Sequence, residues 1–430
     1  MNSIWFILRW IQFMGWFYFY YSNIQTQSYY AKQCKERLEG LGILGIKLGQ
    51  YLCNRPDMIS DVCKKELSVL LTQNKIHDMS HTKKILEESG IKLTLGEVIG
   101  SGSLTQVYRC SLGDQHDLVV KVKHPEVLQL PSEIKALKSM IYGLSCFSRF
   151  RVLLHMDWDE FFLSIEEQLD LTNEIRYITR YHEIYQDLPE ITIPRVVTGD
   201  KNVIVMTFCE GRPMFEFSKE DPRYHRAHNL FVCSMLHMGF TYQLMHGDVH
   251  MGNILVKENG DISIIDFGVC LRLTMEQFLG ILSISKYELD PSYENTENMV
   301  QAIIHDHSID KKPLVIPSLS KELYEKYKTI LSDRGTSPTI SDFFNMIVTV
   351  SQSHGIMIRG NILCYFMNVL LLEGLTPFSE KQELSTILAA SFMMRHPFFK
   401  KEIKNLNEYY DNLLERTNQD LIQKYNLKVI

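Results

Sequence analysis

The chain has 430 residues, of which 45% are hydrophobic, and a formal net charge of −6. This length is enough for two lobes with substantial cores, and the mildly acidic charge without a long basic run excludes nucleic-acid binding through a general electrostatic footprint. The nine cysteines form no Cys-x-x-Cys pair, which argues against a zinc ribbon and predicts reduced thiols in an intracellular compartment.

Residues 1–25 form a hydrophobic, aromatic segment that is a candidate membrane anchor. Residues 4–21 are almost wholly apolar, and three of the chain's four tryptophans lie there. A stretch of this length is at the short limit of a membrane span, and Arg9 would cost roughly 2.5–3.5 kcal/mol near a bilayer centre unless its side chain snorkels to the interface. Three interpretations stay open: a membrane span, a helix lying on a membrane surface, and an apolar helix packed on the protein's own surface.

Residues 26–93 are predicted to form a helical extension. Residues 61–71 and 82–88 each show a helical pattern. Before them, four leucines recur at three- and four-residue steps and predict one apolar helix face, although nearby glycines weaken the helix. These leucines are Leu38, Leu41, Leu44 and Leu48.

Residues 94–211 are predicted to form a β-rich first lobe, the N-lobe, and residues 212–430 a mainly helical C-lobe. The N-lobe contains a helical insert, because residues 131–181 return to helical patterning. Short strands are expected in the C-lobe near Ile254 and Ile262. A β-rich half followed by a helical half is typical of a two-lobed α+β protein. The predicted N-lobe strands are residues 97–99, 106–109, 118–122 and 203–208.

The run from Gly100 to Val107 matches the glycine-rich nucleotide loop G-x-G-x-x-G-x-V of kinases, except that Thr105 replaces the third glycine. Glycines let backbone N–H groups approach phosphates closely. On its own the run is a weak signal, because an ordinary glycine-containing hairpin explains it more simply. The candidate nucleotide-contacting residues in it are Gly100, Ser101, Gly102, Ser103 and Val107.

Lys121 ends an apolar run, and a lysine that points inward needs an anionic partner. In kinases the partners are a phosphate and a helix glutamate, for which Glu174 is the candidate. Asp170 lies four residues before Glu174 and is predicted to share its helix face. Taken singly, an exposed lysine and a solvated acidic helix face would explain the same pattern.

The strongest element begins His246-Gly-Asp248 and ends Gly252-Asn253, directly before a short apolar run. Asp-x-x-x-x-Asn at this place is the spacing of a kinase catalytic loop, with Asp248 to orient or deprotonate the attacking hydroxyl and Asn253 to bind magnesium. Asp266-Phe-Gly follows thirteen residues after Asn253 and supplies a second candidate magnesium ligand. His246 and His250 are interpreted as residues that brace the loop.

Residues 203–208 and the following Cys209-Glu-Gly211 lie where a hinge between the lobes is expected, and Thr207 is a candidate adenine-side residue by position alone. With the elements above, they predict a two-lobed protein-kinase-like fold that binds ATP and Mg²⁺. Phosphoryl transfer needs a phosphate cradle, a cation, metal-binding side chains and a base, and all four occur here in order.

Lys47-Leu-Gly-Gln50, continued by Arg55-Pro-Asp57, resembles the K-x-G-Q and R-P-D elements of the UbiB (AarF, ADCK) family of atypical kinases, and residues 246–253 fit its catalytic loop. Residues 371–374 are more loosely similar. The resemblance implies that K-x-G-Q helices cover the site and obstruct protein substrates, with Lys47 and Gln50 at the matching positions. It also implies ATPase or small-molecule kinase-like behaviour that supports coenzyme Q or lipid metabolism at membranes.

The chain departs from the family pattern at several positions. Glycine and serine replace an alanine-rich loop at residues 100–102, Gln168 replaces the first acid of the E-x-D element, Met251 replaces a proline, and Thr207 stands where an acidic residue is common. Lys121 and Asn253 are retained, and so are the three candidate site acids, so an active nucleotide site is expected. These acids are Glu174, Asp248 and Asp266.

The leading hypothesis is a UbiB-type kinase or ATPase that binds ATP and Mg²⁺ and acts on, or regulates, lipid or quinone metabolism at a membrane. A membrane lipid or quinone precursor is therefore a candidate partner beside the nucleotide, and no protein partner is indicated. Two alternatives stay open: a catalytically weak nucleotide-binding scaffold (a pseudokinase), and a small-molecule phosphotransferase similar to the aminoglycoside or choline kinases.

Overall fold

The computed structural model describes most of the chain up to residue 363. The described residues are 3–53, 55, 58–71, 76–145, 158–248, 251–272, 274, 292–303, 312–334, 340–354, 356, 358–359 and 363.

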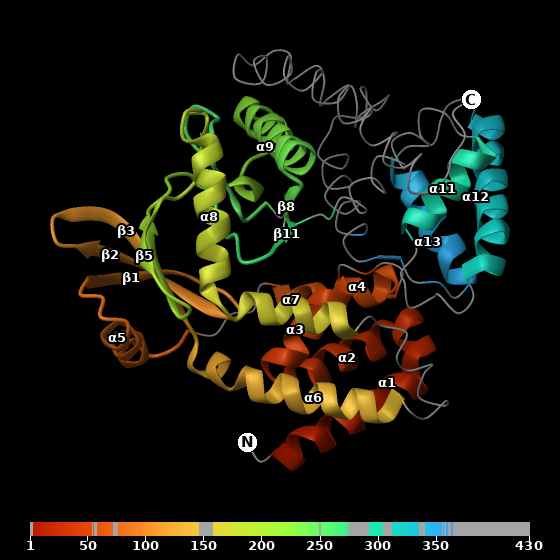
Figure 1. Cartoon of the computed structure of the whole chain (residues 1–430), viewed down its shortest axis with the longest axis horizontal. Helices are drawn as coiled ribbons and strands as arrows, with labels where there is room; N and C mark the ends of the chain where they lie inside the picture. Colours follow the sequence, from red (N-terminus) through yellow and green to blue (C-terminus); the bar gives the residue numbers. More distant parts are fainter. Residues whose placement is uncertain are drawn as a thin grey trace, which may run out of the picture.

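The N-terminal helices and the helical insert of the N-lobe share one hydrophobic core (Figure 1). The insert was predicted within the N-lobe, yet its apolar faces pack on the extension, where Trp158, Phe161 and Phe162 join leucines of the first helices. The elements of this helical bundle are α1 (Ser3–Thr26), α2 (Ser28–Gly40), α3 (Ile43–Cys53), α4 (Asp61–Leu67), η1 (Ser68–Leu71), α6 (Leu130–Ser145) and α7 (Trp158–Gln168).

The single helix face predicted from the four leucines is divided between two helices. The backbone of Gly42 has a φ of 80°, a left-handed conformation that ends helices, so α2 stops at Gly40 and α3 begins at Ile43. Leu38, Leu44 and Leu48 nevertheless enter the same core, because the turn returns α3 onto α2.

Helix α1 has one buried and one exposed aromatic face. Trp10 is fully buried in the bundle core, whereas Trp5 and Phe19 expose 65% and 79% of their surfaces. Within the described part of the chain, no helix combines the length and the apolar character needed to cross a membrane.

The N-lobe sheet has five antiparallel strands in the order β1-β2-β3-β6-β5. Successive residues of β3 face opposite sides: Val120 and Val122 pack under α5, and Val119 packs toward α8. This alternation directs Lys121 to the α8 side. The elements are α5 (Met79–Glu88), β1 (Thr94–Ser101), β2 (Thr105–Leu112), β3 (Gln115–Lys123), η2 (Pro125–Gln129), α8 (Leu171–Tyr185), β5 (Val196–Gly199) and β6 (Val203–Thr207).

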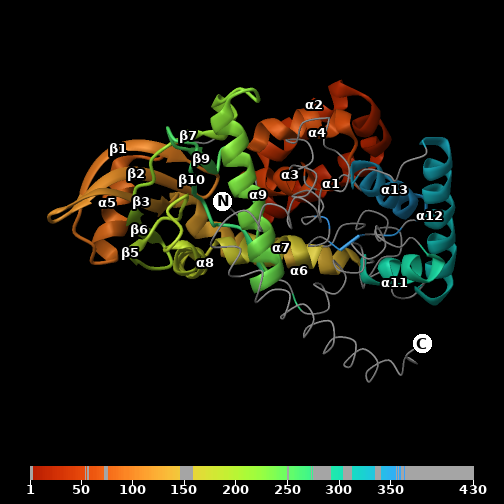
Figure 2. The same ribbon diagram turned by 90° about the horizontal axis from the view of Figure 1, so that it is seen from above.

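The described residues of the C-lobe combine helices with two small sheets. The two short strands expected near Ile254 and Ile262 are both present, and β4, which lies within the predicted N-lobe range, pairs with β10 of the C-lobe. The larger sheet has the order β4-β10-β9-β7, and β11 pairs with β8. Helices α11, α12 and α13 lie together at the far side of the molecule from the N-lobe sheet (Figures 1 and 2). The elements are β4 (Ile191–Thr192), β7 (Arg212–Pro213), η4 (Met214–Glu216), α9 (Pro222–Tyr242), β8 (Leu244–His246), β9 (Ile254–Val256), β10 (Ile262–Ile264), β11 (Cys270–Arg272), α11 (Tyr293–Ile303), α12 (Lys312–Arg334) and α13 (Ile340–Ser353).

Aspartate side chains cap the N-terminal ends of α5, α8 and α9. The side chains of Asp78, Asp170 and Asp221 each accept a hydrogen bond from the backbone N–H two residues later, which is the usual N-cap contact. The prediction that Asp170 shares a helix face with Glu174 is therefore wrong, because Asp170 has an extended backbone and lies just before α8.

Candidate functional site

Lys121, Glu174 and Asp266 form a compact charged cluster between the lobes. The Nζ atom of Lys121 lies 2.6 Å from Oε1 of Glu174 and 2.8 Å from Oδ1 of Asp266. Lys121 comes from β3, Glu174 from the first turn of α8, and Asp266 from the segment after β10. Three elements that are far apart in the sequence thus meet at one ammonium group.

The pKa values in this cluster keep the lysine charged. Burial would lower the pKa of Lys121, but the carboxylates of Asp266 and Glu174 outweigh burial and raise it. The pKa of Asp266 would also rise on burial, yet the charge of Lys121 and hydrogen bonds from Lys121 and the Gly268 N–H hold it well below its usual range. Burial raises the pKa of Glu174 despite the adjacent Lys121.

Packing fixes the place of Asp266. Phe267 is fully buried, with its ring centroid 4.8 Å from that of Tyr181 on α8, and the backbone N–H of Gly268 donates to Oδ1 of Asp266 over 3.2 Å. The side chain of Asp266 keeps 45% of its surface exposed, against 4% for Glu174. Only Asp266 of these two acids has substantial access to an incoming ligand.

Asn253 lies beside Asp266 because β9 and β10 run antiparallel from this point. The backbone N–H of Ile265 donates to the carbonyl of Asn253 over 3.0 Å, so the two candidate metal ligands occur at the same end of the strand pair. The side-chain amide of Asn253 donates to the backbone carbonyl of Asp248 over 3.0 Å. Asn253 therefore links the backbone of the candidate base, Asp248, to the candidate metal position.

Magnesium fits this donor set. Carboxylate and amide oxygens are the hard ligands that Mg²⁺ takes, and Mg²⁺ sites in kinases use one or two side chains plus substrate phosphates. Across the described residues, no group of three or more His, Cys, Asp or Glu side chains could hold a metal ion. Asp266 and Asn253 are the two side chains that would hold Mg²⁺ in the kinase arrangement, together with phosphate oxygens.

The catalytic-loop backbone is braced by a histidine, as expected. The N–H of Asp248 donates to Nδ1 of His246 over 3.2 Å, and His246 is buried with its ring centroid 5.2 Å from that of Phe267. His250 lies outside the described residues, so its predicted bracing role stays a prediction.

The candidate phosphate loop forms the tight turn between β1 and β2. The N–H of Gly102 donates to the carbonyl of Thr105 over 2.7 Å. A Cβ atom at Gly100 or Gly102 would meet only ordinary contacts of 3.7 Å or more. Val107 pairs with Lys121 across β2 and β3, so Val107 faces the same side of the sheet as the charged cluster.

Lys47 of α3 reaches toward the same region. Its Nζ atom donates to Oε1 of Gln168 over 2.7 Å. Burial lowers the pKa of Lys47 to about 8, while the negative charges of Asp248 and Asp266 oppose the fall. The extension therefore lies close enough to the site for its lysine to interact with the candidate base Asp248 and the candidate metal ligand Asp266.

Three other candidates are engaged elsewhere. The side-chain amide of Gln50 donates to the carbonyl of Leu70 in η1, Asp170 caps α8, and the hydroxyl of Thr207 accepts a hydrogen bond from the Arg195 N–H beside β5. Thr207 is the last residue of β6, and residues 208–211 connect it to β7 of the C-lobe sheet. Residues 56–57 and 371–374 lie outside the described residues.

Two residues gain importance from the structure. Arg55, which appeared only as part of a motif, is 2% exposed, and His124 contacts the Gly102 carbonyl at 3.0 Å. His124 follows directly after the lysine strand in Val-Lys-Val-Lys-His-Pro125. Its position next to the lysine strand was the one sequence feature that could have indicated a role for His124. Nothing in the sequence indicated that its ring turns back to the loop.

Comparison with known proteins identifies the domain. Residues 95–299 match the ABC1 atypical kinase-like domain. A Clostridium pasteurianum protein described as an uncharacterized protein in the hydrogenase 1 5′ region is 23% identical over 95% of this chain and 78% of its own length. The AarF domain-containing protein kinase 1 of Xenopus laevis is 25% identical over 77% of this chain and 64% of its own length.

Four further relatives are matched over only part of their length, because this chain covers 35% to 46% of each. Among solved structures, the complex of Rv3197 with erythromycin from Mycobacterium tuberculosis aligns with a TM-score of 0.43 and 20% identity, over 67% of this chain and 80% of that protein.

Proposed function

Since this chain belongs to the UbiB/AarF/ADCK family of ABC1 kinase-like proteins, we propose that it binds Mg²⁺ and ATP at the Lys121 cluster and catalyses ATP hydrolysis or phosphoryl transfer. The observation that carries the proposal is the position of one buried ammonium between Glu174 and Asp266, at 2.6 and 2.8 Å. Kinases use this pairing of lysine, helix glutamate and metal-binding aspartate.

Each residue has a distinct part in the proposal. Glu174 holds the ammonium of Lys121, which neutralises phosphate charge, and Asp266 and Asn253 supply oxygen ligands to magnesium. Asp248 orients the attacking hydroxyl or water and takes its proton. The bound nucleotide supplies the phosphoryl group, and the turn at residues 100–105 offers backbone N–H groups to its phosphates.

We further propose that the site serves a lipid-like or quinone-like substrate at a membrane surface rather than a protein. Two observations support this. Lys47 brings α3 next to the acids of the site, which leaves less room for a polypeptide, and α1 of the same bundle exposes Trp5 and Phe19. Tryptophan and other large aromatic residues are enriched where proteins meet the lipid headgroup region.

Nucleotide binding and turnover are tested with the purified full chain. We expect Asp266→Asn and Lys121→Ala to weaken Mg·ATP binding at least tenfold in calorimetry, by about 1.4 kcal/mol or more. Lys123→Met is the matched control, because Lys123 is a neighbouring buried lysine of β3 whose Nζ contacts Asn202 instead. We expect Asp248→Asn to keep binding and to lose phosphate release by a factor of about 10² or more.

Two results would overturn the assignment. Wild-type affinity in Asp266→Asn would remove the metal site from Asp266, and unchanged phosphate release in Asp248→Asn would remove the base. Tight Mg·ATP binding without any release by the wild type would instead support the scaffold alternative.

The membrane proposal is tested by flotation with phosphatidylcholine vesicles. We expect Trp5→Gln combined with Phe19→Gln to shift the protein out of the vesicle fraction, since both side chains lie on the exposed face of α1. Phe215→Gln is the control, because Phe215 is 60% exposed in the C-lobe. Equal flotation of the α1 variant and the wild type would contradict a role for α1.

A further inference from the structure

A histidine contacts the carbonyl side of the candidate phosphate loop. Nε2 of His124 lies 3.0 Å from the carbonyl oxygen of Gly102, and the backbone N–H of His124 donates to the carbonyl of Leu104 over 2.9 Å. His124 is only 5% exposed. One residue at the end of the lysine strand therefore holds two points of the turn between β1 and β2.

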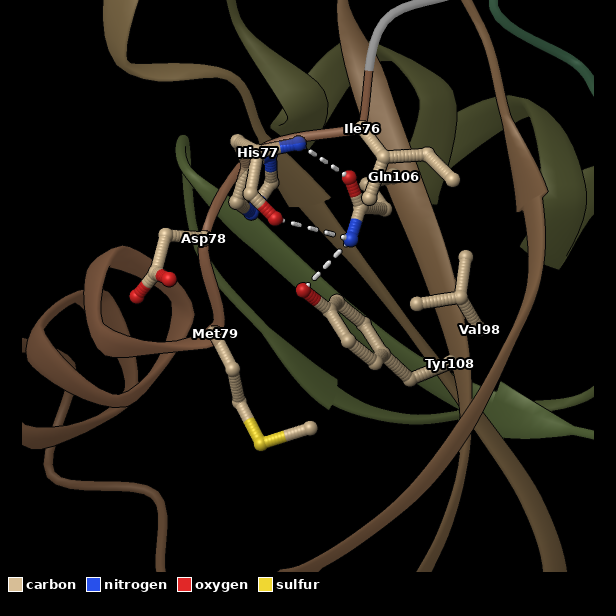
Figure 3. A pocket seen from close by; sticks show the side chains of 7 residues that line it. All are labelled: Ile76, His77, Asp78, Met79, Val98, Gln106 and Tyr108. Carbon is tan, nitrogen blue, oxygen red and sulfur yellow. Dashed lines mark hydrogen bonds between the residues drawn. The ribbon is translucent and has the colours of Figure 1, made fainter.

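A second histidine connects His124 to the segment that follows the K-x-G-Q helices. Nδ1 of His77 lies 2.7 Å from Nδ1 of His124, and Nε2 of His77 lies 2.7 Å from Oγ1 of Thr82. Thr82 and Tyr108 place their hydroxyl oxygens 2.9 Å apart, so either can donate. Figure 3 shows His77 beside Gln106 and Tyr108.

Gln106 closes this network from β2. Its side-chain amide donates to the hydroxyl of Tyr108 over 2.6 Å, and its oxygen accepts from the backbone N–H of His77 over 2.8 Å. The backbone and the ring of His77 are therefore both held by groups of the N-lobe and of α5.

The proton positions along the network follow from the acceptors. A carbonyl cannot donate, so Nε2 of His124 carries a hydrogen toward Gly102, and the neutral ring then accepts at Nδ1. Nδ1 of His77 must therefore donate, which leaves its Nε2 to accept from the hydroxyl of Thr82. Thr82 then accepts from Tyr108, which itself accepts from Gln106.

Both rings are neutral in this arrangement. Burial lowers the pKa of His77 to about 4 and also lowers the pKa of His124. If His77 presented its other tautomer, its Nδ1 would accept, and a neutral His124 would have to turn an unprotonated Nε2 toward the Gly102 carbonyl. The contact between the two imidazoles thus sets whether the Nε2 atom of His124, which faces the loop, carries a proton.

We propose that His124 is a positioning residue for the nucleotide loop and that His77, by fixing the tautomer of His124, couples the loop to the end of the K-x-G-Q extension. The proposal rests on the proposed nucleotide site. It assigns His124 no contact with the nucleotide itself, only control of the turn that the proposed function places at the phosphates.

The test compares substitutions that remove or keep each donor. We expect His124→Ala to raise the Kd and the KM for Mg·ATP about tenfold, the loss of about one hydrogen bond, with kcat changed less than twofold. His124→Gln keeps an N–H near the Nε2 position and should recover most of the affinity. His77→Leu should weaken binding several-fold, and His77→Asn, which keeps a donor near Nδ1, should recover most of that loss.

His81→Ala is the matched control within the same histidine cluster. Its ring centroid lies 5.0 Å from that of His77, but its Nε2 contacts the carbonyl of Lys123 rather than the loop. We expect wild-type nucleotide affinity. An equal loss of affinity in His81→Ala and His124→Ala, or failure of His124→Gln to recover binding, would overturn the positioning role.

A measurement without nucleotide separates this proposal from the proposed function. Amide hydrogen exchange across residues 100–105 should accelerate in His124→Ala and His77→Leu and stay unchanged in His81→Ala. If the wild type fails to bind Mg·ATP, the proposed function falls, and exchange still decides whether the histidines hold the loop. Unchanged exchange in His124→Ala would overturn the inference even in a protein that binds nucleotide.

Discussion

At the scale of single residues, the site depends on one lysine between two acids of unequal exposure. Glu174 is almost completely buried and Asp266 keeps 45% of its side-chain surface exposed, so Glu174 is the structural partner and Asp266 the partner that faces ligand. Lys121 supplies one positive charge to these two acids, so the trio carries an excess of negative charge, and the Asp266 carboxylate is the part of it that ligand can reach. A divalent cation at Asp266 would compensate it.

Replacing Lys121 should therefore damage the fold as well as the site. In Lys121→Met, Glu174 stays buried without its cation, and we expect the free energy of unfolding in urea at pH 7 to fall by about 3–5 kcal/mol. The double variant Lys121→Met/Glu174→Leu removes the stranded acid as well and should recover most of this loss. Equal stability of the single and double variants would show that burying Glu174 without the Lys121 ammonium costs no stability.

Lys47 should make stability depend on pH in the alkaline range. Burial lowers its pKa from 10.5 to about 8, so between these two values the unfolded chain binds more protons than the folded chain. The free energy of unfolding of the wild type, measured against Lys47→Met, therefore rises as the pH increases from about 8 to 10.5. Below pH 8, Lys47 is protonated in both the folded and the unfolded wild type. The difference in the free energy of unfolding between wild type and Lys47→Met should therefore be constant there.

Urea unfolding at pH 7 and pH 10 checks this window. Gln168→Glu supplies the control, because a carboxylate beside the Lys47 ammonium raises the lysine pKa and should reduce the change between the two pH values. A difference between wild type and Lys47→Met that is the same at pH 7 and pH 10 would show that Lys47 keeps an ordinary pKa.

At the scale of elements, the sequence could predict strands from their apolar runs and site residues from the spacing between motifs. The apolar runs and glycines around β1, β2, β3 and β6 indicated the N-lobe strands, and motif spacing indicated Lys121, Glu174 and Asp266, which the structure brings together. A motif gives residue identity but not side-chain direction. For that reason Gln50 and Asp170 were indicated as site residues, although they contact η1 and the start of α8.

The sequence could not predict which helices pack against one another, for a different reason. Periodicity shows that a helix has an apolar face but not which surface covers it, so nothing indicated that α6 and α7 pack on α1 to α4. The sequence did not predict the boundary between α2 and α3, because it does not distinguish Gly40, Gly42 and Gly45, which all lie near it. Only Gly42 of these three has a left-handed backbone.

The glycines at this boundary should respond in opposite ways to alanine. At Gly42 the φ of 80° strains any side chain, so Gly42→Ala should lower the free energy of unfolding by about 1–2 kcal/mol. Gly40 lies in α2, where a Cβ atom would approach Nη2 of Arg9 at an ordinary 3.5 Å, and Gly40→Ala should be neutral or stabilising by up to about 1 kcal/mol. Thermal unfolding of the two variants compares them, and the same shift in both would contradict the boundary.

At the scale of the whole molecule, Arg55 joins three parts of the chain. Its Nη1 atom donates to the hydroxyl of Tyr51 on α3 over 2.8 Å and lies 3.5 Å from Glu160 on α7. Its Nη2 atom donates to the carbonyl of Ile358, beyond α13, over 3.3 Å. A planar guanidinium can serve several acceptors at once, which lysine cannot reproduce. Arg55 thus links the extension and the insert to the C-terminal part.

Loss of this link should weaken the attachment of the extension to the C-lobe. Arg55→Met keeps an apolar stem but leaves the carbonyl of Ile358 and the acid of Glu160 without their Arg55 contacts, which should lower the free energy of unfolding by about 2–4 kcal/mol. We also expect unfolding followed by tryptophan fluorescence, which reports chiefly on α1 and α7, to precede the loss of helical circular dichroism. Arg212→Met is the control, since Arg212 is largely exposed and 4.0 Å from Glu216, and surface pairs of this kind contribute about 0–1 kcal/mol. Coincident transitions and an unchanged midpoint in Arg55→Met would mean that the core shared by α1–α4, α6 and α7 attaches the extension without Arg55.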